Sequence, residues 1–527
     1  MSQDNKTSTA PPKQGRGFLD RIFPHPARDA AQQDAPAPTA QKSTLNLAEI
    51  QGFILRGYRM PLVRHFLLTV NDPAQARKLL GRLVSGDESD APQITTAENW
   101  HVGFAPGPGD NPTEAPRRKP DYCLNVGITW PGMLALEIKQ RVPNISFKSF
   151  DAFTQGAAER AKLVGDTGPS APEHWIDAFQ HDNDHVMLTL HAISPDAMTS
   201  YTVRLVALFS ESNAFREIWR QDGAALLEIQ NGQPVPTARV HFGYTDGLSM
   251  TTIRGGPEKY HPDHQQPCDS WLFVLQEEAE NYIVPEPKAL GLNGSFAVFK
   301  MIETDVVAFE NFLQSNKDKI DPELLAAKMC GRWRNGVPLA LSPDTDKPAN
   351  LTADQMNNFE YVNADGSGDP KGLCCPVGAH MRRINPRGQP VTGQGVPGGS
   401  NNTHRLIRRG LPYGPTYDAA KAYDGVERGL LGYFINSNIQ NQYEFVLGHW
   451  VNESEFAGAV RLNPKSKDPM IGTQDPAESI FVIPQRNGAP PIKVTGLSTF
   501  VKTRAAAYCF LPSVTAIKFI ANLGARP

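Results

Sequence analysis

The fold is decided first by residues 64–83, which read RHFLLTVNDPAQARKLLGRL. The first seven of these residues are dense in branched and aromatic side chains, a composition typical of a β-strand. Asp72 and Pro73 then supply the signals that open a helix, and apolar residues recur on one face from Ala74 to Leu83. The stretch therefore predicts a strand that is followed at once by an amphipathic helix.

The same pattern of strand and helix recurs in the first half of the chain. Residues 123–129 (CLNVGIT) predict a strand, and a helix is expected from Pro131. Residues 185–191 (HVMLTLH) alternate as a half-buried strand and precede a helix over residues 195–211. Short strands and helices in this order predict an α+β layer, in which an antiparallel sheet carries helices on one face.

The second half of the chain repeats this pattern. Its predicted strands are residues 295–302, 432–436 and 507–511, and its predicted helices are residues 305–314 with a Thr304 cap, 439–450 and 513–523. The repeat is one of pattern and not of residue identity. We therefore expect an N-terminal domain over residues 45–285 and a similar C-terminal domain over residues 286–527.

Residues 1–44 are rich in Ala, Pro, Gln, Asp and Thr, a composition that predicts a disordered tail. One apolar island, residues 17–23 (GFLDRIF), interrupts this tail. The island could form a short docking helix on a partner, or it could be a sticky patch without a partner.

Composition excludes several classes of function. Lys and Arg (52) balance Asp and Glu (55) to a net charge of −3, which argues against a nucleic-acid partner. No stretch approaches 18 consecutive apolar residues, so no membrane-spanning helix is expected. The N-terminus is polar and lacks the apolar core of a signal peptide, and the six scattered cysteines do not suggest a disulfide framework. The cytoplasm is the expected location.

Residues 241–247 (HFGYTDG) place one carboxylate, Asp246, in a turn between Gly243 and Gly247. The two glycines let the backbone bend sharply and approach a cofactor. Asp246 is a candidate acid–base group, although an Asp-Gly pair is also common in ordinary turns. An arginine from residues 405–414 (RLIRRGLPYG) would lower the pKa of Asp246 and keep the carboxylate ionised.

Residues 378–387 (GAHMRRINPR) place one imidazole, His380, among arginines. A neutral imidazole can ligate iron, and the small residues before His380 leave room for a flat macrocycle. Arg382 and Arg383 would then neutralise the anionic edge groups of the macrocycle. The alternative for His380 is an ordinary core or surface histidine, and the alternative for the arginine cluster is a solvated face of a loop.

Three motifs, residues 241–247, 378–387 and 405–414, occur in this order along the chain. Together they resemble the haem site of the dye-decolorizing peroxidases. The resemblance runs from Leu45 to the C-terminus, and the length points to the larger C/D-type branch of that family. It includes residues 165–172 (GDTGPSAP), 290–295 (LGLNGS), 326–334 (AAKMCGRWR), 442–446 (QYEFV) and 500–504 (FVKTR). The resemblance implies two ferredoxin-like α+β halves, with haem b held mainly by the C-terminal half.

Carried over by position, the resemblance implies that Asp246 is the distal acid–base group and His380 the proximal iron ligand. Arg408 matches the distal arginine, although Arg405 and Arg409 stay open as alternatives. Glu444 falls near the family's carboxylate behind the proximal imidazole.

The resemblance also implies a peroxidase that reduces hydrogen peroxide and oxidises bulky phenols or dyes, in part at surface Tyr or Trp residues. A homo-oligomer stays open. The first alternative is a protein that binds or handles haem without significant peroxidase turnover, which would need His380 but neither Asp246 nor Arg408. A non-haem metal hydrolase would need clustered His and carboxylate ligands, which the sequence does not offer.

Overall fold

The structure is a computed structural model. It describes residues 45–98, 120–142, 144–148, 150–249, 251–257, 267–277, 284–348, 351–352, 354–391, 401–418, 425–454 and 466–524. The tail over residues 1–44, with its apolar island, lies outside the described residues.

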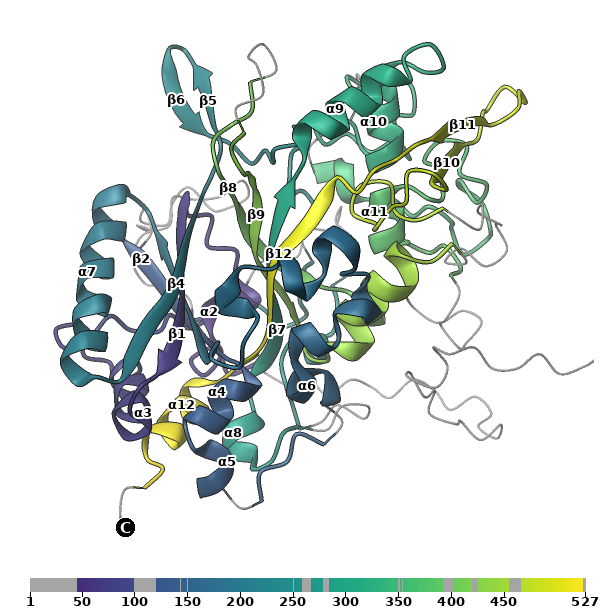
Figure 1. Cartoon of the computed structure of the whole chain (residues 1–527). Helices are drawn as coiled ribbons and strands as arrows, with labels where there is room; N and C mark the ends of the chain where they lie inside the picture. The colour runs from purple at the N-terminus through teal and green to yellow at the C-terminus, as the bar shows by residue number, and fades with distance from the viewer. Residues whose placement is uncertain are drawn as a thin grey trace, which may run out of the picture.

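One antiparallel sheet of eight strands organises the described chain, in the order β4-β1-β3-β2-β12-β7-β9-β8 (Figure 1). The first half supplies β1 (Leu62–Val70), β2 (Tyr122–Ile128), β3 (Val186–Ala192) and β4 (Phe215–Ala224). The second half supplies β7 (Ser295–Thr304), β8 (Ile407–Tyr413), β9 (Gly429–Asn436) and β12 (Val501–Leu511). If the strands of each half are numbered from one to four, both halves have the order 4-1-3-2, which is that of a ferredoxin-like unit.

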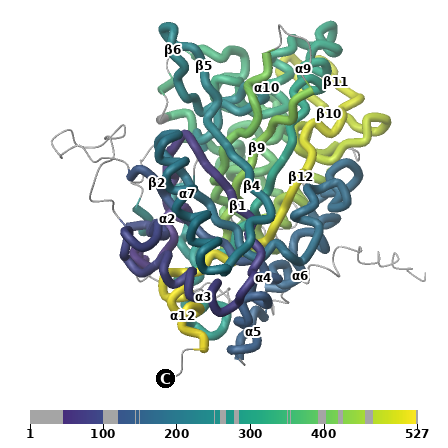
Figure 2. The backbone as a smooth tube through the Cα atoms, turned by 60° about the vertical axis from the view of Figure 1, so that its left-hand side comes forward, coloured from purple at the N-terminus to yellow at the C-terminus, as the bar shows by residue number. Residues whose placement is uncertain are grey.

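The two halves form one continuous sheet. β12 pairs with β2 at Phe510 and Ile128, and the outer strands β4 and β8 also contact each other. The sheet therefore curls toward a barrel. Two short hairpins, β5 (Leu227–Gln230) with β6 (Gln233–Pro236) and β10 (Ile480–Ile483) with β11 (Ile492–Thr495), project at the end of the sheet near α9 and α10 (Figures 1 and 2).

Helices pack against the sheet and at its ends. In the first half they are α2 (Gly52–Leu55), α3 (Pro73–Arg82), α4 (Trp130–Ala135), α5 (Ile138–Arg141), α6 (Asp151–Glu159) and α7 (Pro195–Ser212). In the second half they are α8 (Lys288–Gly291), α9 (Val306–Ser315), α10 (Pro322–Cys330), α11 (His380–Ile384) and α12 (Val514–Ala521). The first turn of α3 forms where expected, because the Asp72 carboxylate accepts hydrogen bonds from the N–H groups of Ala74 and Gln75.

The predicted α+β class with two ferredoxin-like halves is confirmed, and every predicted strand forms. Three local predictions differ in detail from the structure. Asp305, and not Thr304, caps α9, because the Asp305 carboxylate accepts from the Ala308 N–H while the Thr304 hydroxyl donates to a backbone carbonyl. The expected helix over residues 439–450 consists of two π-helical segments, η8 (Gln440–Glu444) and η9 (Val446–Val451). The helix predicted from Pro131 is divided into α4 and α5 by Glu137, which has a φ of +56°.

The division into domains at residues 285 and 286 stays a prediction. A single apolar core contains residues of both halves, among them Phe66 and Leu188 from the first and Phe296 and Phe510 from the second. All six cysteines are unpaired, and five of them are buried. Within the described segments, no helix is long and apolar enough to cross a membrane.

Candidate active site

A cavity lies between the strands of the second half and α11, and the loop over residues 240–249 forms part of its wall. It has two adjoining lobes with about 870 and 1280 Å³ of free space. The residues common to both lobes include Ile302, His380, Met381, Arg408, Leu430 and Ile471. Aliphatic side chains from several elements thus surround one histidine and one arginine.

His380 is the first residue of α11, and its two ring nitrogens have different surroundings. The distance from Nδ1 to Oδ2 of Asp468 is 2.9 Å. No group among the described residues binds the other nitrogen, Nε2, and the ring lines the cavity. A carboxylate on Nδ1 fixes the imidazole tautomer and leaves the Nε2 lone pair free to bind a metal.

Asp468 is itself held tightly. Its side chain is completely buried, and its Oδ1 accepts hydrogen bonds from the backbone N–H groups of Met470 (2.8 Å) and Ile471 (3.0 Å). Burial alone would raise the pKa of Asp468, but His380 and Arg383 hold this pKa below its ordinary value. Asp468 therefore stays an acceptor and strengthens the donor character of the imidazole.

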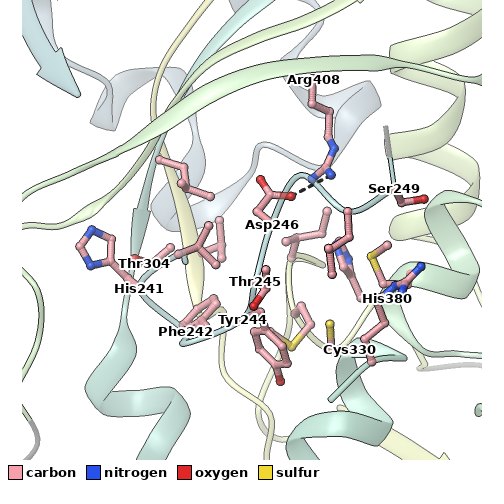
Figure 3. A pocket seen from close by; sticks show the side chains of 18 of the residues that line it. His241, Phe242, Tyr244, Thr245, Asp246, Ser249, Thr304, Cys330, His380 and Arg408 are labelled. Carbon is pink, nitrogen blue, oxygen red and sulfur yellow. Dashed lines mark hydrogen bonds and ion pairs between the residues drawn. The ribbon is translucent and has the colours of Figure 1, made fainter. Parts of the chain in front are cut away.

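Asp246 and Arg408 come from different elements and meet at the cavity (Figure 3). Asp246 lies in a loop whose flanking glycines, Gly243 and Gly247, have φ angles of +82° and +76°, a region that favours glycine. Arg408 projects from β8, and its Nη2 donates to Oδ1 of Asp246 over 2.9 Å. The Arg408 side chain is 36% exposed and the Asp246 side chain is 43% exposed. Both groups are therefore accessible to a small molecule in the cavity.

The electrostatics of Asp246 favour its ionised form. Burial alone would raise the pKa of this carboxyl group, but Arg408, the Gly247 N–H and His380 hold the pKa below its ordinary value. The carboxylate is thus a proton acceptor beside a fixed cation.

The structure distinguishes the three candidate arginines by their contacts. Arg408 alone contacts Asp246, because the Arg409 guanidinium donates to the Phe53 carbonyl at 2.7 Å. Arg405 is buried and donates to Asn385 Oδ1 at 2.5 Å, at the edge of the second lobe. Arg405 and Asn385 thus give the second lobe a polar edge, in addition to the Lys300–Asp166 ion pair that also lines it. A guanidinium at the edge of a mostly apolar cavity suits a flat macrocycle with carboxylate side groups.

The contacts of Arg382 and Arg383 do not fit their predicted role at the cofactor. Both side chains are completely buried, and neither lines the cavity. Arg382 binds Asp369, Gln389 and the Cys375 carbonyl. Arg383 binds backbone carbonyls, one of them that of Ser466, near Asp468. The two arginines stabilise the segments around α11, because each guanidinium donates to several buried backbone carbonyls there.

The prediction for Glu444 is also corrected. The carboxylate behind the His380 imidazole is Asp468, which lies 88 residues further along the chain. Glu444 is buried elsewhere, where it pairs with Arg160 and accepts a hydrogen bond from Tyr508. Gly247 does not line the cavity, and its contact with the site is the backbone N–H that binds Asp246.

Two histidines, His241 and His380, line the cavity; His241 Nε2 binds the Tyr413 carbonyl, whereas His380 Nε2 faces the cavity without a described partner. Within the described part of the chain, no three His, Cys, Asp or Glu side chains are grouped so that they could hold a metal ion. One free imidazole nitrogen on an aliphatic cavity with a polar edge fits the axial ligation of haem iron.

Comparison with known proteins places this geometry in a family. Residues 49–225 match the model of the DyP dimeric alpha+beta barrel domain. The chain is 27% identical to dye-decolorizing peroxidase msp1 of Mycetinis scorodonius over 548 residues, which cover 98% of this chain and 93% of the relative. It is 30% identical to a dye-decolorizing peroxidase of Mycena epipterygia over 374 residues, 67% of this chain and 66% of the relative.

The fold also matches solved structures. A dye-decolorizing peroxidase in complex with 2,6-dimethoxyphenol superimposes with a TM-score of 0.70 and 25% sequence identity, covering 90% of this chain and all of the other. The chain belongs to the dye-decolorizing peroxidase family, and it is a haem peroxidase of that type.

Proposed function

We propose that the protein binds haem b, reduces hydrogen peroxide and oxidises bulky phenolic or dye-like donors one electron at a time. In this proposal His380 is the axial iron ligand, Asp246 the acid–base group and Arg408 the cation that stabilises the peroxide. The observation that carries the proposal is the cavity in which the free Nε2 of His380 and the Asp246–Arg408 pair share one space.

The chemistry of each residue follows from its contacts. Haem, when bound, supplies the electrons that cleave the peroxide O–O bond and regains them from two donor molecules. Asp246 would accept a proton from one oxygen of hydrogen peroxide and pass it to the other oxygen, which leaves as water. Arg408 donates hydrogen bonds to the oxygen on which negative charge develops. His380 keeps its proton on Nδ1, where Asp468 holds it, so that Nε2 remains a ligand.

Printed names and titles of relatives support the class of donor. The relatives from Mycetinis scorodonius and Mycena epipterygia are named for dye decolorization, and the solved relative holds 2,6-dimethoxyphenol. The direct test is oxidation of this phenol by the haem-loaded protein. We expect turnover that requires both peroxide and haem. Turnover that persists in haem-free protein, or none in fully loaded protein, would contradict the proposal.

Asp468→Asn should weaken haem binding without removing the iron ligand. Loss of such a partner of a ligating histidine typically lowers metal affinity or activity about 10–100-fold, because the imidazole loses its fixed orientation and part of its basicity. Haem titration of the variant, followed by absorbance, measures this change. Asp222→Asn is the control, because Asp222 forms an exposed ion pair with Arg64 and neither residue lines the cavity. Equal haem affinity in wild type and Asp468→Asn would contradict the assigned role.

The lowered pKa of Asp246 predicts the pH dependence of the peroxide step. The folded state favours the carboxylate, so the ion pair contributes stability above the unfolded pKa of about 3.9. This contribution is lost as the pH falls through the lower folded pKa. Because Asp246 can accept a proton only as the carboxylate, the rate of the peroxide reaction should follow the same ionisation. We expect its rate constant to stay constant down to about pH 4 and to decrease only at lower pH. In Arg408→Leu the fall should begin at a higher pH. Stopped-flow measurements from pH 3 to pH 7 test this, and identical profiles would contradict it.

The second candidate function is haem binding without significant peroxidase turnover. Such a protein would need His380 and its support from Asp468. It would not need a carboxylate and a guanidinium that meet at 2.9 Å and remain accessible in the same cavity. This pair favours the peroxidase.

The N-terminal tail should be dispensable for catalysis, because His380, Asp246 and Arg408 all come later in the chain and the composition of residues 1–44 does not favour a packed core. A chain that begins at Ser43 should keep its peroxidase activity per haem. If the apolar island docks onto a partner, deletion should instead change localisation or the elution volume in size-exclusion chromatography. A large loss of activity at unchanged haem content would show that the tail belongs to the catalytic unit.

The proposed function also includes a location in the cytoplasm and a homo-oligomeric state.

A further inference from the structure

The loop over residues 240–249, which carries Asp246, lies against the turn over residues 331–338, which follows α10. Gly336 in this turn has a φ of +97°, a region that favours glycine. A Cβ atom at Gly336 would collide with Cδ1 of Leu248, so the turn and the loop approach each other as closely as a glycine permits. The turn is thus placed to support the loop that holds the proposed acid–base group.

The Arg334 side chain connects this loop with two helices. Its Nη1 donates to the Phe242 carbonyl, four residues before Asp246, at 2.6 Å. Its Nη2 lies 2.8 Å from Oε1 of Glu310 in α9, and its Nε donates to Oε2 of Glu323 in α10 at 3.1 Å. Each of the three guanidinium nitrogens thus has its own partner, and a planar guanidinium with three such partners has one fixed orientation.

Arg334 also contacts the loop directly before Asp246. The backbone N–H of Thr245 donates to the Arg334 carbonyl at 2.8 Å, and the Thr245 hydroxyl donates to the same carbonyl at 3.2 Å. Gly243 lies so close to the guanidinium that a Cβ atom there would be 2.9 Å from Nη1 of Arg334. One residue thus binds the loop at its beginning and beside Asp246, while the Asp246 side chain keeps its own contact with Arg408.

The charge of Arg334 does not explain its relation to Asp246. Burial raises the pKa of Asp246, and the groups that lower this pKa are Arg408, the Gly247 N–H and His380. Arg334 is not among these groups, and it lines neither lobe of the cavity. An effect of Arg334 on the peroxide reaction is therefore expected to pass through the position of the loop.

We propose that Arg334 is a positioning residue for the reaction with peroxide, because it fixes the loop so that the Asp246 carboxylate stays beside Arg408 in the cavity. This inference rests on the proposed function, in which Asp246 moves a proton of the peroxide. Misplacement of a reacting group by about 1 Å can cost about 10²-fold in rate. A lysine in place of Arg334 would keep the positive charge, but its single nitrogen cannot reproduce the planar fork that binds the loop carbonyl and both carboxylates.

The first test is the rate constant of the peroxide reaction in haem-loaded Arg334→Lys, measured by stopped-flow absorbance. We expect a decrease of up to about 10²-fold at the haem content of wild type. Arg220→Lys is the matched control, because Arg220 also pairs with a carboxylate, that of Glu217, and lies over an aromatic ring, that of Phe66. Arg220 lines neither lobe of the cavity, and the control should react at the wild-type rate. A wild-type rate in Arg334→Lys would overturn the proposal.

Two further measurements separate positioning from a general loss of stability. In the Asp246→Asn background, Arg334→Lys should cause no further decrease, because the group that it positions has already lost its function. In Arg334→Lys alone, the decrease of the rate constant at acidic pH should begin at a higher pH than in wild type. The reason is that a carboxylate displaced from Arg408 loses the neighbour that lowers its pKa. An equal loss in both backgrounds, or a slow reaction with an unchanged pH profile, would show that Arg334 does not act through Asp246.

If Arg334→Lys does not fold or does not retain haem, the variant that combines Glu310→Gln with Glu323→Gln decides the question. It removes both carboxylates that orient the guanidinium, and both side chains reach the surface, with 31% exposure for Glu310 and 60% for Glu323. We expect a slower peroxide reaction and the same shift of the pH profile. Wild-type values for both in this variant would overturn the proposal. Absence of any reaction with peroxide in wild type would instead defeat the proposed function.

Discussion

His380→Ala should yield a folded protein that retains little or no haem. The physical reason is that, in the proposed site, Nε2 of His380 would be the one protein ligand of the iron, while most of the remaining lining of the cavity is apolar. The fold should survive, because His380 lies on the cavity surface and its main partner is the side chain of Asp468. The ratio of haem to protein absorbance after purification measures the loss, and circular dichroism measures the fold.

The control for this variant is His174→Ala, which removes an exposed histidine that lines neither lobe of the cavity and should retain full haem. Imidazole added to His380→Ala should restore part of the haem binding, because the free ligand can occupy the vacated space. Full haem retention in His380→Ala with an unchanged spectrum would show that another group ligates the iron.

Asp246→Asn and Arg408→Leu should both slow the reaction with peroxide while haem content stays the same. Loss of a positioned acid–base group typically costs about 10²–10⁴-fold in rate. Loss of one preorganised charge-stabilising donor typically costs about 10²–10³-fold. Stopped-flow absorbance with peroxide in excess measures both rate constants.

Arg409→Leu is the matched control for Arg408→Leu. The two arginines are neighbours on β8, but Arg409 donates to the Phe53 carbonyl and does not contact Asp246. It should therefore react with peroxide at the wild-type rate. A wild-type rate in both Asp246→Asn and Arg408→Leu would contradict the assignment of the two residues, and a slow Arg409→Leu would show that the loss is not specific to the Asp246 contact.

The sequence predicts those parts of the fold that are encoded locally. Branched and aromatic runs such as residues 64–70 carry their own strand signal, and Asp72 carries a cap signal that the structure confirms. β8 escaped prediction because Gly410 and Pro412 lie within it, and both residues normally weaken a strand. As an edge strand, β8 tolerates this proline.

The residues of the site could be predicted from the sequence only where they belong to short, recognisable motifs. The Asp246 turn and the His380 segment have recognisable local sequences, and the structure brings both to one cavity. Asp468 has no such signal, because it meets His380 only through the tertiary fold, in an irregular segment far along the chain. The sequence wrongly predicts that Arg382 and Arg383 bind the cofactor. An arginine cluster in a sequence is equally typical of an anion-binding site and of guanidinium groups that donate to buried backbone carbonyls.

The most direct test of the central claim is the absorbance spectrum of the purified, haem-loaded protein before and after one equivalent of hydrogen peroxide. The account predicts a Soret band typical of histidine-ligated ferric haem. Peroxide should shift this band rapidly, and addition of 2,6-dimethoxyphenol should return it to its original position. A protein that binds no haem, or whose Soret band does not respond to peroxide, would contradict it.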